Sequence, residues 1–156
     1  MENNILAVLD EAFVLGSFKS FCDKNSSIES KQRLRNILSR TTNPINTIKQ
    51  IISDEMGNIS DIQAIRMHEL ITAFLNKSSH RKKVSIDEKK RLLALQNYKC
   101  KFCGCNINES DHLDHKVPFV YVGDELKNNK QMLCSHCNKK KNKSLYYQIK
   151  VYLNLN

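Results

Sequence analysis

Four cysteines stand in two pairs with the spacing of metal-binding knuckles. Cys100 and Cys103 form the first pair, and Cys134 and Cys137 form the second. A two-residue spacer returns the second thiolate of each pair to the same ion, so two pairs complete a tetrahedral zinc site. Gly104 follows the first pair and tolerates the positive φ that such a turn favours. We expect a structural zinc ion here, because a closed four-cysteine site leaves no position for a catalytic water.

Two further cysteines and one histidine are expected to lie outside the zinc ligand set. Cys22 ends a helical pattern and is expected to be a small core residue. Cys105 and His136 adjoin the paired cysteines and could substitute as ligands, but the set of four is complete without them. The alternative to a metal site is a group of buried or redox-active thiols.

The residues between and beside the cysteine pairs can do hydrolytic chemistry. A histidine such as His115 has an ordinary pKa near 6.5, so it can accept a proton from water at neutral pH. Asp114 precedes it in an expected strand and points to the opposite face, where it can bind a metal. A carboxylate oxygen and the amide oxygen of Asn138 suit Mg²⁺ or Mn²⁺ better than zinc. The alternative reading of Asp114 and His115 is a polar surface pair.

Several landmarks in a fixed order resemble the zinc-stapled branch of the HNH, or ββα-metal, endonuclease family. They are Cys100-x2-Cys103, Leu113-Asp114-His115-x2-Pro118, Asn129 and Leu133-Cys134-x2-Cys137-Asn138-x2-Lys141, within residues 98 to about 145. The resemblance implies a β-hairpin followed by a helix, with a divalent ion held between the first strand and the helix. It also implies roles for the matching residues.

By that resemblance, His115 is the general base and Asp114 is the metal-binding acid. Asn129 is the middle asparagine that fixes the loop and the histidine. Asn138 occupies the third motif position, where many relatives have histidine, and is read as a metal ligand through its side-chain oxygen. The catalytic set is therefore His115, Asp114, Asn129 and Asn138.

The charge of the chain favours a polyanionic partner. Lys and Arg outnumber Asp and Glu by 25 to 16, which gives a formal net charge of +9. The expected phosphate contacts are Lys116, Lys139, Lys141 and Lys143. A solvated helix face is the alternative reading for Lys141. DNA is the expected partner, and RNA stays open.

The chain lacks the marks of membrane insertion or secretion. No run of about 18 apolar residues occurs, and the first residues lack a basic segment and a cleavage site. We expect a cytoplasmic location, where reducing conditions favour thiol ligands over disulfides.

Apolar residues at helical spacing predict a helical bundle in the N-terminal half. The expected helices cover residues 3–21, 28–40, 44–56 and 60–75. The polar segment from Asn76 to Val84 has no apolar period and is the expected domain boundary. We therefore expect a helical module over residues 1–80 and a nuclease domain over residues 84–156.

The C-terminal half has mixed patterns, so the fold class is α+β and mostly α. A capping box at Ser85 predicts a helix over residues 86–95. The apolar run Val117 to Val122 predicts a strand, and Leu145 to Leu155 is amphipathic.

Together these features predict a metal-dependent endonuclease that hydrolyses DNA, in restriction, phage defence or a mobile element. The helical module would serve dimerisation, targeting or partner docking. One alternative is a zinc-ribbon nucleic-acid-binding or scaffold protein with a silent HNH site. Another is a nuclease subunit that is active only within a larger defence complex.

Overall fold

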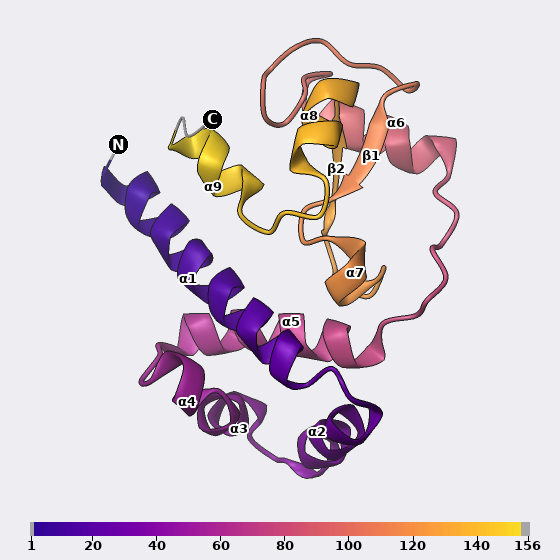
Figure 1. Ribbon diagram of the computed structural model, residues 1–156. Helices are drawn as coiled ribbons and strands as arrows, with labels where there is room; N and C mark the ends of the chain where they lie inside the picture. The colour runs from indigo at the N-terminus through magenta and orange to yellow at the C-terminus, as the bar shows by residue number, and fades with distance from the viewer. Residues whose placement is uncertain (1, 154–156) are drawn as a thin grey trace. The chain divides into compact units, whose positions relative to one another are not determined.

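A computed structural model describes residues 2–153, with side chains from residue 5 onward. The chain forms two compact units, of which the first ends at Lys77 and the second begins at Ser78. In the described part of the chain, most residues are helical and one small antiparallel sheet lies in the second unit (Figure 1). This confirms the predicted fold class, α+β and mostly α.

The N-terminal unit is a bundle of helices arranged around α5. Its elements are α1 (Glu2–Lys24), α2 (Ile28–Arg40), α3 (Pro44–Ile51), α4 (Ser53–Met56) and α5 (Asp61–Asn76). The start of α5 is fixed by a capping box, in which the Ser60 hydroxyl accepts from the Gln63 N–H at 3.2 Å and the Gln63 side chain accepts from the Ser60 N–H at 2.9 Å. Helix α5 contacts α1, α2 and α3, so it forms the centre of the bundle.

Aromatic packing joins α1 to α5 in the core of this unit. The rings of Phe18 and Phe21 each meet Phe74 edge-on, with ring centroids 6.3 Å apart in both pairs. One expectation needs correction, because the predicted helix over residues 44–56 is divided into α3 and α4. The break lies at Ile52, whose φ of −103° and ψ of 6° leave the helical region.

The C-terminal unit places a two-stranded sheet between helices. Its elements are α6 (Ile86–Leu95), β1 (His112–His115), α7 (Phe119–Val122), β2 (Lys130–Leu133), α8 (Ser135–Lys141) and α9 (Tyr147–Tyr152). Strands β1 and β2 are antiparallel, and α8 packs on both of them while α6 packs on β2 (Figure 1). The β1–β2 pair and helix α8 thus form a ββα arrangement.

An apolar cluster that includes Cys100 and Cys137 holds this small unit together. Leu92 and Leu93 of α6 pack against Met132 and Leu133 of β2 and against Cys137 of α8. A unit that spans only residues 78–156 can bury a limited apolar core, so a bound metal would add useful stability.

The run from Val117 to Val122 is not a strand, which corrects the prediction made from its apolar residues. Pro118 has no N–H to donate to a ladder, and both backbone polar groups of Val117 bind the side chain of Asn129 at 2.8 Å. The chain then turns into α7, which ends at Gly123 with φ of 59°. The strand therefore stops at His115.

The end of the chain is also shorter in regular structure than expected. Of the amphipathic segment Leu145 to Leu155, residues 147–152 form α9, and the last two residues of that segment lie outside the described range. Among the described helices, none has the length and apolar character needed to cross a bilayer.

Candidate active site and metal centre

The first cysteine pair lies in a tight hairpin between α6 and β1. Lys99 and Asn106 form an antiparallel bridge at its base. At the tip, the Gly104 N–H donates to the Cys100 carbonyl at 3.0 Å, and Gly104 has φ of 71°. The Cys100 N–H donates to the Cys105 carbonyl at 2.8 Å, so the two arms of the hairpin are held together.

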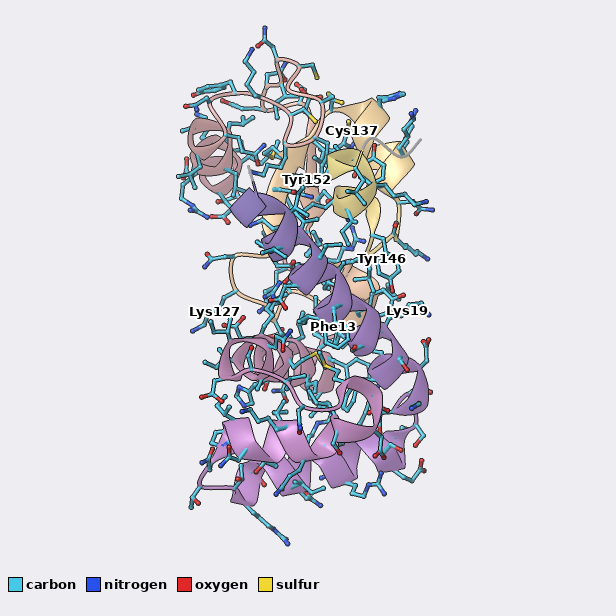
Figure 2. The ribbon with its side chains drawn as sticks, turned by 90° about the vertical axis from the view of Figure 1, so that its left-hand side faces the viewer. Phe13, Lys19, Lys127, Cys137, Tyr146 and Tyr152 are labelled. Atoms are coloured by element: carbon cyan, nitrogen blue, oxygen red, sulfur yellow. The ribbon has the colours of Figure 1, made fainter. Side chains whose placement is uncertain are left out.

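The second cysteine pair is presented by the first turn of α8. Cys134 is the N-cap residue, and its sulfur accepts from the Cys137 N–H at 3.5 Å. Cys137 lies on α8 and is labelled in Figure 2. The Cys134 N–H in turn donates to the Cys100 sulfur at 3.4 Å. Backbone N–H groups thus already point at the sulfurs of Cys100 and Cys134.

The distance between two of the sulfurs fits a tetrahedral ion. For a zinc–sulfur bond of about 2.3 Å, the edge of the ligand tetrahedron is about 3.8 Å, and the Cys103 and Cys134 sulfurs lie 3.7 Å apart. The backbone N–H of Cys105 is the main cause that lowers the pKa of the Cys103 thiol to about 6, so this group is a ready thiolate at neutral pH. The donor set therefore can hold a metal such as zinc.

Five cysteines, rather than the expected four, gather at this centre. The sulfurs of Cys100, Cys103, Cys105 and Cys134 all lie within 4.8 Å of one another. Cys137 is buried, and its thiol adjoins those of Cys103, Cys134 and Cys100. Burial is the first cause that raises the pKa of Cys137, followed by these neighbouring thiols. Cys22 is buried in the N-terminal unit, and burial raises the pKa of its thiol to about 12.

His115 is paired with an aspartate that the sequence analysis did not identify. Its Nε2 atom lies 2.8 Å from the Oδ1 atom of Asp124, and the two side chains are 10% and 3% exposed. The ring also meets Phe119 edge-on, with centroids 5.5 Å apart. These contacts fix the orientation of the imidazole.

The environment of Asp124 keeps it ionised. Burial works to raise its pKa, but hydrogen bonds from His115 and from the Lys82 backbone N–H, at 2.8 and 2.9 Å, together with the charge of Lys130, hold the pKa below its ordinary value. An ionised carboxylate accepts hydrogen bonds and donates none. Nε2 of His115 therefore carries the proton, and Nδ1 of the neutral ring is left with the lone pair that can act as a base.

Asp114 lies on the opposite face of β1 and is held by two partners. Asp114 is the cross-strand partner of Gln131, whose amide donates to its Oδ2 atom at 2.8 Å. The ammonium of Lys141, on α8, lies 3.1 Å from Oδ2 and also donates to the His115 carbonyl at 2.8 Å. The carboxylate thus faces α8, while the imidazole of His115 faces away from it.

The structure places the remaining predicted residues in different environments. Asn129 is buried, and its two bonds to Val117 fix the loop after β1. Asn138 is half-buried, one turn before Lys141 on α8. Lys116, Lys139 and Lys143 are exposed. Lys141 is only 2% exposed, which is at odds with the expected phosphate contact, because its ammonium is engaged with Asp114.

A hollow of about 340 Å³ lies beside His115 and Asp124. Basic side chains line it from the segment before α6 and from α6, namely Arg81, Lys82 and Lys89, together with His112. The guanidinium of Arg81 stacks over the Phe119 ring at 4.8 Å, so the segment before α6 is tied to the loop beside the histidine. The arrangement combines an oriented base with positive charge, which suits a reaction on a phosphate group.

No sequence signal pairs Asp124 with His115. An acid after a glycine in a loop has many ordinary roles, and only the fold brings this one to the imidazole. The position of Cys105, two residues after the expected ligand Cys103, did suggest a place near the metal. It was not predicted as a ligand because four other cysteines already completed the tetrahedral set.

The hairpin, the helix across it and the thiol cluster define a ββα-metal unit. Residues 100–144, under a third of the chain, match the family model of HNH endonucleases. This confirms the resemblance seen in the sequence. At family level the match indicates nuclease activity and nucleic-acid binding. Searches of curated proteins and of solved structures gave no match.

Proposed function

We propose that this protein is a metal-dependent endonuclease that hydrolyses phosphodiester bonds of DNA. The supporting observation is that two candidate catalytic residues lie on opposite faces of β1, inside the segment that matches the HNH family. His115 and its partner Asp124 lie on one face, and Asp114 lies on the other face against α8. One face therefore handles the proton and the other offers an oxygen ligand for a cation.

His115 acts as the general base through Nδ1. It accepts a proton from the water that attacks the phosphorus, and the electron pair of the broken P–O bond goes to the leaving oxygen. Asp124 positions the ring and stabilises the imidazolium that forms, because its carboxylate is already hydrogen-bonded to Nε2. Asn129 acts as a positioning residue through the loop that follows His115.

Asp114 and Asn138 are the residues that would hold a Mg²⁺ or Mn²⁺ ion. Both offer oxygen donors, and Asn138 lies three residues before Lys141 on α8, on the side of the helix that meets Asp114. The carboxylate already has a cationic partner in Lys141, which a divalent ion would replace or join. When bound, such an ion neutralises charge on the phosphoryl and leaving oxygens.

The cysteine cluster serves as a structural zinc site in this proposal. Thiolate ligands in tetrahedral positions favour zinc over Mg²⁺ or Mn²⁺. The cluster joins the hairpin of Cys100 to the first turn of α8, so zinc there fixes the helix that carries Asn138. Lys116, Lys139 and Lys143 are proposed as contacts to the phosphate backbone, since all three are exposed and cationic.

The N-terminal unit is proposed to serve targeting, dimerisation or partner docking in restriction, phage defence or a mobile element. Leu6, Leu9 and Phe13 on α1 are exposed at 67%, 51% and 45%, which is unusual for large apolar side chains (Figure 2 labels Phe13). A nuclease that acts only within a larger complex is compatible with this unit.

The test is nicking of supercoiled plasmid by the wild-type protein and by His115→Ala, each with Mg²⁺, Mn²⁺ or EDTA. Wild-type protein should nick only with added metal, and the variant should lose about 10²-fold or more in rate while keeping its melting profile. A folded His115→Ala protein that cuts as fast as wild type would remove histidine from the mechanism. Linear duplex, single-stranded DNA and RNA serve as further substrates.

A second candidate is a nucleic-acid-binding or scaffold subunit with a silent site. The observation that favours it is the ion pair between Lys141 and Asp114, which neutralises the predicted metal ligand. In that case the wild-type protein binds DNA but cuts none of the substrates, with or without divalent ions.

A further inference from the structure

A fifth sulfur at the metal centre has no role in a four-cysteine site. Cys105 follows the hairpin tip, and its sulfur lies within 4.8 Å of those of Cys100, Cys103 and Cys134. We propose that Cys105 is an alternative fourth ligand that exchanges with Cys137, while Cys100, Cys103 and Cys134 remain bound to zinc throughout. The inference depends on the zinc-binding part of the proposed function and is independent of nuclease activity.

Packing does not account for the position of Cys105. Its side chain is exposed and takes no part in the apolar cluster formed around Leu93 and Met132. Its neighbours are instead thiols, because its sulfur lies within 4.8 Å of the sulfurs of Cys100, Cys103 and Cys134. A small exposed residue in a turn is ordinarily free to point into water, and this one points at other sulfurs.

The backbone of the hairpin holds Cys105 in this position. The Cys105 carbonyl accepts from the Cys100 N–H at 2.8 Å, directly beside the bridge between Lys99 and Asn106. Gly104 has φ of 71°, so the chain reverses between Cys103 and Cys105 without strain. Cys105 is therefore fixed by the same hairpin that fixes the first pair.

Cys137 meets the same three sulfurs from α8. It is buried, its thiol adjoins those of Cys103, Cys134 and Cys100, and its N–H donates to the Cys134 sulfur. In this proposal, Cys100, Cys103 and Cys134 can be completed to a set of four thiols by either Cys105 or Cys137. Because tetrahedral zinc takes four ligands, one of the five thiols is always in excess.

The exchange has a consequence for helix α8. With Cys137 bound, the first turn of α8 is tied to zinc through both Cys134 and Cys137. With Cys105 bound, only the N-cap residue Cys134 ties the helix to the metal. The residue after Cys137 is Asn138, so the ligand set in use sets how firmly that side chain is held.

The experiment measures zinc content and Co²⁺ absorption in the full chain, with five variants. They are Cys137→Ser, Cys105→Ser, the double variant, Cys100→Ser and Cys22→Ser. We expect about one zinc ion per chain in wild type and in the first two variants, and much less in the double variant and in Cys100→Ser. Cys22→Ser controls for loss of a cysteine outside the cluster. After Co²⁺ substitution, Cys137→Ser should keep the thiolate-to-cobalt absorption intensity of Cys105→Ser, because four thiolates remain in each.

Loss of zinc from Cys137→Ser alone, to the level of Cys100→Ser, overturns the exchange. So does a Cys137→Ser protein whose C-terminal unit is unfolded, because the Cys105 set then cannot sustain the fold. A Cys105→Ser change that leaves the zinc content of Cys137→Ser unaltered also overturns it. Wild-type protein that holds no zinc contradicts the structural zinc site itself, which separates the two failures.

Discussion

At the scale of single residues, the pairing of His115 with Asp124 makes a sharp prediction. Asp124→Asn keeps the size of the side chain but removes the charge that stabilises the imidazolium. We expect plasmid nicking to slow by about 10-fold or more, and the acidic limb of the pH–rate profile to move to lower pH. The shift in the profile separates positioning of the base from simple damage to the fold, which would lower the rate equally at every pH.

The same residue gives a pH dependence of stability. Because the pKa of Asp124 is lowered in the folded protein, its contribution is fully present above the ordinary value of an aspartate, near 3.9. The contribution is lost as pH falls through the lower folded value. Urea unfolding of the C-terminal unit should therefore show that wild type and Asp124→Asn differ more at about pH 6, above the ordinary pKa of an aspartate, than at about pH 3, below it.

Lys141 is the second residue whose removal has a defined effect. It is 2% exposed and pairs with Asp114, so Lys141→Met leaves a carboxylate in a largely buried place without its cation. We expect a loss of about 3–5 kcal/mol in the free energy of unfolding, measured by urea titration.

The matched control is Lys139→Met on the exposed side of the same helix, for which the change should stay within about 0.5 kcal/mol. Adding Asp114→Asn to Lys141→Met should recover much of the lost stability. Equal effects at the two lysines would mean that the ion pair with Asp114 contributes nothing.

The residues and elements differ in how far they could be predicted from sequence. The knuckle spacings, the Asp-His dipeptide and the helical periods are local patterns, so the ββα segment and the N-terminal helices could be predicted. The partnerships of Asp124 and Lys141 arise from the folded chain, because the partners are brought together by a turn at Gly123 and by the packing of α8 on β1. The prediction of a strand from the apolar run at Val117 was wrong because Pro118 has no backbone N–H and because the Asn129 side chain binds both backbone polar groups of Val117.

At the scale of elements, zinc is expected to decide whether the C-terminal unit folds. Strands β1 and β2 and helix α8 are short, and they share a single apolar cluster. The free energy of metal binding is therefore expected to supply much of the stability of the C-terminal unit. Cys134→Ser removes a zinc ligand, while the serine hydroxyl can still accept the N-cap hydrogen bond of α8. We expect this variant to release zinc and to lose the cooperative unfolding of residues 78–156, while residues 1–77 keep theirs.

Amide NMR spectra can follow this outcome, because each amide resonance reports on one residue and so on one of the two units. Cys22→Ser is the control, since Cys22 lies in the N-terminal unit. Full zinc content with an unchanged melt of Cys134→Ser would falsify the stabilising role.

At the scale of the whole molecule, the position of the unit boundary can be tested by truncation. The backbone N–H of Lys82 donates to Asp124, and Arg81 stacks on Phe119, so both residues belong to the site. A fragment of residues 78–156 should fold, hold zinc and nick plasmid. A fragment that begins at residue 84 lacks both contacts and should nick more slowly at equal zinc content. Equal rates would show that the segment before α6 is dispensable.

The side chain of Gln96, just after α6, also limits how copies of the molecule can associate. Its amide donates to the Met132 carbonyl at 2.9 Å and accepts from the Met132 N–H at 2.8 Å, on the side of β2 away from β1. The Gln96 amide thereby takes the place of a neighbouring strand at Met132, on the outer edge of β2. Strand addition is therefore blocked at Met132 on this edge of β2.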